Sequence, residues 1–179
     1  MSQIYDLHCH STASDGSLPP VELVRRAHEK GVNVLALTDH DVTDGLQEAA
    51  TTAAELGMGF VPGIEISVTW SSSNQTVHIV GLHIDMASEE LQQGLEKLRE
   101  FRNWRAEEIG RRLEKKGISG AYVGASDLAK GAIISRTHFA RFLVEEGYAK
   151  DMRDVFKNYL IKNKPGYVSG KWASLEEAV

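Results

Sequence analysis

Short apolar runs alternate with amphipathic stretches over the first third of the chain. Strands are predicted at residues 4–7, 34–37 and 59–61, and helices at residues 19–30 and 45–56. Parallel strands need a crossover of about a dozen residues or more, and helices of this length supply it. The pattern therefore predicts an α/β fold built on a parallel sheet or barrel.

The pattern changes after residue 63. Two strands are predicted at residues 64–70 and 76–84, and the polar segment between them favours an antiparallel hairpin. From residue 88 to residue 116, apolar residues recur at three- to four-residue spacing or its multiples, as expected for one long amphipathic helix. Shorter helices are predicted at residues 125–130, 136–146 and 152–161. We expect these helices to form an insertion on the α/β scaffold.

The C-terminal residues predict the start of another helix. Ser174 and Glu177 have the spacing of a capping box, in which each side chain bonds to the backbone of the other residue. The chain stops at Val179, whereas an isolated helix needs about 12 to 15 residues to be stable in water. We therefore expect the native protein to continue beyond this residue.

Composition and charge limit the classes of protein to which the chain can belong. With 179 residues, 42% of them hydrophobic, it can bury the core of one globular domain. Its net charge of -5 argues against a uniformly basic surface that grips DNA, although metal ions and a local arginine cluster could still bind RNA or another anion. The single cysteine excludes an intrachain disulfide, and no apolar run approaches the roughly 20 residues of a membrane span. We therefore predict a cytoplasmic protein without a membrane partner.

Candidate ligands for metal ions follow the predicted strands. His8 and His10 are two residues apart at the end of the first strand, so both would point into one pocket while Cys9 faces the other way. His40 follows the second strand, and Glu65 follows the third. The C-terminal ends of parallel strands meet at one edge of an α/β barrel, and active sites form there. We therefore expect these side chains to lie close together.

The ligand types indicate the chemistry. Imidazole and carboxylate groups without thiolate suit manganese, iron(II) or zinc, and a carboxylate such as Glu65 can bridge two ions. Asp15 is a further candidate ligand, although an aspartate before a glycine can also simply begin a turn. Paired metal ions favour the hydrolysis of phosphate esters, because they orient water and neutralise charge on the phosphoryl oxygens.

The roles of several neighbouring residues are open to more than one interpretation. Asp39 and Asp41 flank His40 and are predicted to orient an imidazole ring rather than to bind an ion. His78 and His83 are five residues apart and face opposite sides of a regular strand, and the spacing does not choose between them as ligands.

The start of the predicted helix 136–146 is a candidate anion site. Arg136 and His138 follow Ser135, a suitable N-cap residue, and helix N-termini attract phosphate. The alternative is a capped surface helix with incidental charges. The arginines of the long helix are interpreted as a solvated face; they are Arg99, Arg102, Arg105, Arg111 and Arg112.

Together these motifs resemble a known family. Four segments are similar to the opening motifs of the polymerase and histidinol phosphatase (PHP) domain family: residues 6–11 (DLHCHS), 14–16 (SDG), 38–41 (TDHD) and 62–65 (PGIE). Residues 78–82, 135–143 and 166–168 further resemble one branch, the 3',5'-nucleoside bisphosphate phosphatases that also act as 5'-to-3' exoribonucleases. The resemblance covers essentially the whole chain.

The resemblance implies a fold and a division of the chain. The fold would be a distorted seven-stranded (β/α) barrel with a mainly helical insertion. Residues 1–87 would form the N-terminal part of the barrel with the metal-binding motifs, residues 88–165 the insertion, and residues 166–179 an incomplete return to the barrel. The family closes its site with later His-Pro-Gly and Asp-x-His segments, which this chain does not reach. We therefore expect an open sheet edge and possible self-association through the incomplete barrel.

The resemblance also implies ligands and an activity. Two to three divalent ions, with Mn²⁺ favoured over Fe²⁺ or Zn²⁺, would be held by His8, His10 and Glu65, by Glu65 and His78, and by Asp15 and His40. Arg136 and His138 would hold the substrate phosphate.

The implied protein is a metal-dependent phosphoesterase that removes the 3'-phosphate of nucleoside 3',5'-bisphosphates and trims short RNA from its 5' end. A metal-bound hydroxide would be the nucleophile, and the general acid is not assigned. The alternatives are a phosphatase for a small metabolite such as histidinol phosphate, and a metal-binding fragment that is catalytically incomplete.

Overall fold

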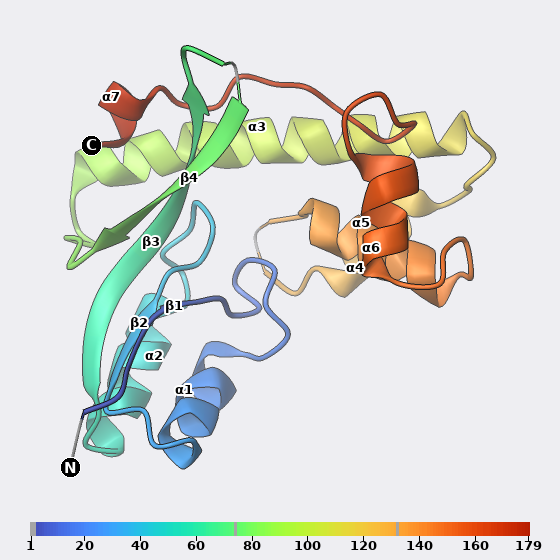
Figure 1. Cartoon of the computed structure of the whole chain (residues 1–179). Coiled ribbons are helices and arrows are strands. Elements are labelled where there is room, and N and C mark those ends of the chain that lie inside the picture. Colours follow the sequence, from blue (N-terminus) through green and yellow to red (C-terminus); the bar gives the residue numbers. More distant parts are fainter. Residues whose placement is uncertain (1–2, 74, 132) are drawn as a thin grey trace.

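The computed structural model describes residues 3–73, 75–131 and 133–179. These residues form a curled four-stranded sheet, with helices packed against it, and a separate cluster of helices beside it (Figure 1). In spatial order the strands are β1 (Tyr5–Cys9), β2 (Val34–Leu37), β3 (Gly59–Trp70) and β4 (Gln75–Leu82). The first three strands are parallel, and β4 runs antiparallel to β3. The crossovers are α1 (Pro20–Glu29) and α2 (Leu46–Glu55). The predicted α/β class is confirmed.

Strand β3 changes its partner along its length. The sequence predicted two strands, at residues 59–61 and 64–70, but the structure has one strand of 12 residues. Its pairing with β2 ends at Leu37↔Pro62, and its pairing with β4 begins at Gly63↔Leu82. Proline has no amide hydrogen to give to a ladder, so it fits the point where one partner ends. The prediction of two strands was wrong because a change of partner requires no break in the strand.

The two faces of β3 have different environments. Ile64 and Ile66 are buried in a core with Leu95 of the long helix, whereas Glu65 and Ser67 line a cavity on the other face. This alternation is the two-residue period of a strand. A second core lies where helices α1 and α2 cover the parallel strands. Its apolar residues bury Leu35 and Leu37 of β2 completely. The sheet is therefore anchored by two cores.

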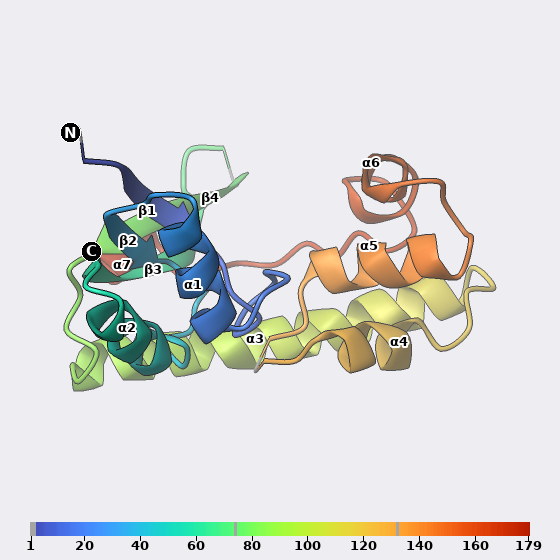
Figure 2. The same ribbon diagram turned by 90° about the horizontal axis from the view of Figure 1, so that it is seen from below.

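A long helix connects the sheet to a helical cluster. Helix α3 (Glu89–Glu114) has 26 residues, and Ser88 caps its start by accepting a hydrogen bond from the amide of Leu91. It runs from the sheet to a cluster of four helical segments (Figure 2). These are α4 (Ala121–Leu128), α5 (Arg136–Glu145), α6 (Met152–Val155) and the π-helical turn η1 (Phe156–Leu160). Their shared core includes Ile109, Leu113 and Phe139. Within the described residues, no helix is long and apolar enough to cross a membrane.

Most helix boundaries lie within two residues of the predicted ones, but two helices differ more. Helix α4 begins at Ala121 rather than residue 125, because Gly120 takes a left-handed conformation with φ of 70° immediately before it. The single helix expected at residues 152–161 is divided into α6 and η1.

The chain then returns to the sheet. The amide of Thr69 donates to the carbonyl of Ala173 at 2.8 Å, and α7 (Leu175–Ala178) follows. The predicted capping box between Ser174 and Glu177 is present. Strand β1 forms one edge of the sheet: β2 is its only described neighbour, and its Tyr5 is exposed.

Candidate metal centre

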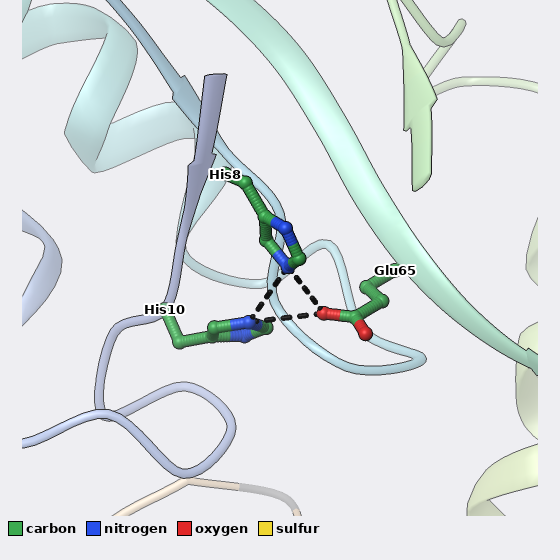
Figure 3. A group of neighbouring side chains, drawn as sticks. All are labelled: His8, His10 and Glu65. Atoms are coloured by element: carbon green, nitrogen blue, oxygen red, sulfur yellow. Dashed lines mark hydrogen bonds and ion pairs between the residues drawn. The ribbon is translucent and has the colours of Figure 1, made fainter. Parts of the chain in front are cut away.

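Two histidines and a carboxylate meet beside the end of β1 (Figure 3). His8 Nε2 lies 2.7 Å from Glu65 Oε2, and His10 Nε2 lies 3.0 Å from the same oxygen. The two imidazole nitrogens are 3.3 Å apart. His8 and His10 therefore point toward the same carboxylate, in line with the common direction expected from their spacing. Glu65 comes from within β3 rather than from its end, because β3 continues past β2 to pair with β4.

The other predicted ligands surround the same carboxylate. His78 Nδ1 lies 3.3 Å from Glu65 Oε1, and His40 Nδ1 lies 3.8 Å from Glu65 Oε2. On its other side, His40 Nε2 is 4.0 Å from Asp15 Oδ1. Three overlapping groups result, each with ligand atoms within 4.8 Å of one another: His8, His10 and Glu65; His10, Asp15 and His40; and His40, Glu65 and His78.

The alternative ligand His83 lies outside these groups. It is exposed, and its backbone has φ of 62° just after β4 ends. His78, by contrast, sits within β4 and is directed toward Glu65. The spacing of the two histidines left this choice open, and the geometry of the hairpin favours His78.

The charges of the cluster are strongly coupled. Burial alone would raise the pKa of Glu65, but the hydrogen bond from His10, the nearby His40 and the hydrogen bond from His8 lower it to about 2. Burial lowers the pKa of His40 to about 4, and the positive charge of Arg102 acts in the same direction. At neutral pH the site therefore combines a carboxylate anion with a neutral imidazole, which are the forms that bind metal ions.

Two unpaired nitrogen atoms test whether the site fits metal ions. Nδ1 of His10 and Nδ1 of His40 are buried and have no hydrogen-bond partner among the described residues. Buried polar atoms without partners are costly. His40 Nδ1 lies 3.8 Å from Glu65 Oε2, so an ion bound by these two atoms would satisfy it, whereas His10 faces Glu65 through its Nε2. Cys9 points away, donates to the carbonyl of Ala36 at 3.1 Å, and has its pKa raised to about 12 by burial. The donor set is therefore nitrogen and oxygen only, as expected for Mn²⁺, Fe²⁺ or Zn²⁺.

Asp39 organises the loop that carries two of the candidate ligands. It accepts hydrogen bonds from the amide and hydroxyl of Ser11, at 2.7 and 2.6 Å, and from the hydroxyl of Ser14 at 2.6 Å. We expected Asp39 to orient an imidazole ring, but both its oxygens are bonded to this loop. Because the loop lies between His10 and Asp15, Asp39 sets the positions of these ligands indirectly.

Asp41 connects the site to the long helix. Its carboxylate is fully buried, and it accepts hydrogen bonds from the amide of Ser67 at 2.8 Å and from Nε of Arg102 at 2.6 Å. Arg102 also donates to the hydroxyl of Ser67 at 2.8 Å. The described hydrogen bonds of Asp41 thus fix α3 against β3, whereas we had predicted that Asp41 orients an imidazole ring.

Helix α5 is docked onto the candidate ligand Asp15. The hydroxyl of Thr137 donates to Asp15 Oδ2 at 2.9 Å, and the hydroxyl of Ser135 donates to the same oxygen at 3.3 Å. Burial would raise the pKa of Asp15, but the nearby His40 and the bond from Thr137 lower it. The start of α5, far away in the sequence, therefore forms one wall of the site.

The two predicted phosphate-binding residues differ in their surroundings. Arg136 lines the cavity, and its guanidinium lies over the ring of Phe156 at 5.7 Å. His138 is buried, and its Nδ1 accepts a hydrogen bond from the amide of Ser135 at 3.0 Å, which completes the helix cap. Its Nε2 is the ring atom left to bind a ligand.

Sequence reasoning missed two arginines of the cavity. The cavity has a volume of about 700 Å³ and is lined by Arg102 and Arg105 as well as by Glu65 and His78. We interpreted the arginines of this helix as a solvated face, yet Arg102 is only 6% exposed. The spacing in the sequence could have indicated that Arg102 is buried, because residue 102 continues the apolar stripe of residues 95, 98, 106 and 109. The interpretation holds for Arg111, which pairs with Glu108 at the surface.

A family model describes most of the chain. Residues 6–167 match the PHP domain. This chain belongs to the PHP domain family. The resemblance predicted from the motifs is thereby confirmed.

Curated relatives of this PHP domain include enzymes that act on nucleotides and RNA. The chain is 53% identical over 175 residues to a 3',5'-nucleoside bisphosphate phosphatase of Chromobacterium violaceum, covering 97% of this chain and 61% of the relative. It is 48% identical over 178 residues to the 5'-3' exoribonuclease Rnm of Escherichia coli, covering 98% of this chain and 60% of the relative. The chain thus spans about three fifths of the length of these relatives.

Two solved structures share the fold of this chain. An amidohydrolase from Chromobacterium violaceum, solved with sulfate and without metal, superposes with a TM-score of 0.94 at 53% identity over 98% of this chain and 61% of that one. A candidate metal-dependent phosphoesterase from Bifidobacterium adolescentis superposes with a TM-score of 0.91 at 26% identity, over 99% of this chain and 62% of that one.

Proposed function

We propose that this PHP domain belongs to a metal-dependent phosphoesterase that removes the 3'-phosphate of nucleoside 3',5'-bisphosphates and trims short RNA from its 5' end. The observation that carries the proposal is the set of three overlapping ligand groups, in which Glu65, His10 and His40 each occur twice. Overlapping groups of this kind suit adjacent ions that share ligands, as in two-metal phosphoesterases. The named activities of the relatives support the choice of substrate.

In this proposal the site holds two to three divalent ions. His8, His10 and Glu65 would hold one ion, Glu65 and His78 a second, and Asp15 and His40 a third. Manganese is the metal we favour; the imidazole and carboxylate ligands suit it, as they also suit iron(II) and zinc. Bound ions of this type orient a water molecule, lower its pKa and neutralise charge on phosphoryl oxygens.

The protein's own groups would position the substrate. Arg136, at the start of α5, would bind the phosphate through its guanidinium, and Nε2 of His138 would donate a second hydrogen bond. Asp39 and Asp41 would act indirectly, since the first fixes the ligand loop and the second fixes α3. The residues of the helical part, 88–165 in our division, therefore supply the anion-binding side of the cavity. A cytoplasmic location remains our prediction.

The proposal is tested by measuring bound metal and phosphate release together. We expect purified protein to hold divalent metal and to release phosphate from adenosine 3',5'-bisphosphate when Mn²⁺ is added, with adenosine 5'-monophosphate as the product. Histidinol phosphate serves as the comparison substrate, because faster release from it would favour the small-metabolite alternative. Absence of both tight metal and turnover would contradict the proposal for this chain.

A further inference from the structure

Two arginines of α3 stand side by side at the wall of the cavity. Arg102 and Arg105 are three residues apart, which places them on adjacent turns of one helix face. Both guanidiniums lie over the ring of Trp172, at 5.0 and 5.3 Å from its centroid. Both residues line the cavity that also contains Glu65 and His78. The cavity therefore has a positive wall facing the candidate metal ligands.

The charges of these two arginines are balanced differently. Arg102 is paired with the buried carboxylate of Asp41 at 2.6 Å. Arg105 has one described hydrogen bond, from its Nε to the carbonyl of Val168, and this bond is long at 3.4 Å. In the described parts of the chain, no carboxylate oxygen lies within 4.0 Å of its guanidinium. Arg102 is thus a structural group, whereas the Nη atoms of Arg105 are available to a ligand.

The surroundings of Arg105 concentrate positive charge. Burial lowers its pKa to about 9, and the neighbouring charges of Arg136 and Arg102 act in the same direction. Arg136 likewise has no described carboxylate partner within 4.0 Å. Two half-buried guanidiniums that repel each other across a cavity are stabilised when an anion lies between them.

We infer that Arg105 forms a second anion subsite, which binds the phosphate of the substrate that is not hydrolysed. This inference rests on the proposed function and adds to it a reason for preferring substrates with two phosphates. The planar guanidinium can donate two parallel hydrogen bonds to a phosphate. A cavity of about 700 Å³ lies within the usual size range for a ligand such as a nucleotide. With the 3'-phosphate at the candidate metal ligands, the 5'-phosphate would lie against Arg105.

Comparing two substrates in matched variants tests this assignment. Adenosine 3',5'-bisphosphate carries both phosphates, and adenosine 3'-monophosphate lacks the second. We expect Arg105→Gln to lower kcat/KM for the bisphosphate by roughly 10- to 100-fold, the usual effect of losing a hydrogen bond to a charged group, mainly through KM. Its effect on the monophosphate should be less than about threefold, because that substrate does not use the subsite. Arg105→Lys should restore part of the preference.

The control variant is Arg111→Gln on the same helix. Arg111 is exposed and bound to Glu108, so its replacement should leave kcat/KM unchanged for both substrates. If Arg105→Gln lowers kcat/KM equally for both substrates, with an unchanged melting temperature, the inference is overturned and the proposed function stands.

A binding measurement separates the subsite from the chemistry. Adenosine 5'-monophosphate is titrated into chelator-treated protein by calorimetry, and we expect Arg105→Gln to weaken its binding at least about tenfold while Arg111→Gln does not. If no phosphate ester is hydrolysed but this difference appears, the proposed function fails and the subsite stands. If binding is identical in the two variants, the subsite is refuted.

Discussion

Glu65 is the residue around which the four histidines of the site are arranged. Both of its oxygens are in use, Oε2 toward His8 and His10 and Oε1 toward His78. A glutamine has the same shape, but it lacks the negative charge that would balance divalent ions. The effect of this single charge can therefore be measured separately from the packing of the side chain.

We predict that Glu65→Gln removes at least one bound ion and lowers manganese-dependent phosphate release by more than about 100-fold. Loss of an outer partner of a metal ligand costs about 10- to 100-fold, and a shared ligand should matter more. Metal content by mass spectrometry and initial rates measure the two effects. Glu89→Gln, at an exposed position on α3, should leave both unchanged. Full metal content in Glu65→Gln would show that this carboxylate is not a ligand.

The pKa of His40 predicts how the metal-free protein responds to acid. Burial lowers this pKa from 6.5 to about 4, so between these values the unfolded chain binds a proton that the folded protein does not. Stability should therefore fall as the pH falls through this range, and it should be retained above about pH 6.5. The pKa of His10 is raised by Glu65 against the opposing effect of burial. Its contribution to stability therefore grows as the pH falls, opposite to that of His40.

Replacing His40 by glutamine should reduce the dependence of stability on pH between 6.5 and 4. Urea unfolding of chelator-treated protein at several pH values measures this slope. His28→Gln, at an exposed position of α1, is the control. If stability depends on pH equally in His40→Gln and in the unmodified protein, the lowered pKa does not belong to His40.

At the scale of elements, α3 is held to the sheet by one buried ion pair. Asp41 and Arg102 are 0% and 6% exposed, and each also bonds to Ser67 of β3. Asp41 has φ of 53°, a conformation that aspartate tolerates better than most residues. Removing one partner of such a pair leaves the other charge buried without compensation.

We predict that Asp41→Asn lowers the free energy of unfolding by about 3–5 kcal/mol, the usual result of breaking a buried pair from one side. Urea denaturation followed by circular dichroism measures the loss. Glu108→Gln removes the less buried pairs with Arg111 and Arg112 on the same helix, and it should cost less than about 1 kcal/mol. Similar losses in the two variants would show that burial does not decide the contribution.

These elements also show what the sequence could predict. The parallel strands and their crossover helices follow from local patterns of apolar residues, and so does the cap of α7. The contact of Asp15 with Ser135 and Thr137 joins residues more than a hundred positions apart, and no local pattern records it. The partners of Asp39 and Arg102 were likewise hidden, because the same residue types serve in surface turns and on solvated helices.

At the scale of the whole molecule, β1 is an exposed edge. Tyr5 is 56% exposed and Leu7 is 38% exposed, and β1 has a single described neighbour in the sheet. Free strand edges with apolar side chains tend to pair with other chains. We therefore propose that purified chains associate through this edge as their concentration rises.

Sedimentation velocity of Tyr5→Lys tests this proposal. A lysine on an edge strand disfavours pairing, so the variant should remain monomeric at concentrations where the unmodified chain associates. Val123→Lys replaces a comparably exposed apolar residue on α4 and should not have this effect. Association that persists in Tyr5→Lys would place the contact elsewhere.

The change of partner within β3 has a consequence for folding errors. A shift of one residue in a strand turns every side chain to the opposite face. In β3 such a shift would turn Glu65 away from the histidines and move Ile64 and Ile66 out of their core at the same time. Chemistry and packing are thus encoded by the same register, so a chain misaligned here would lose its ligand set together with its stability.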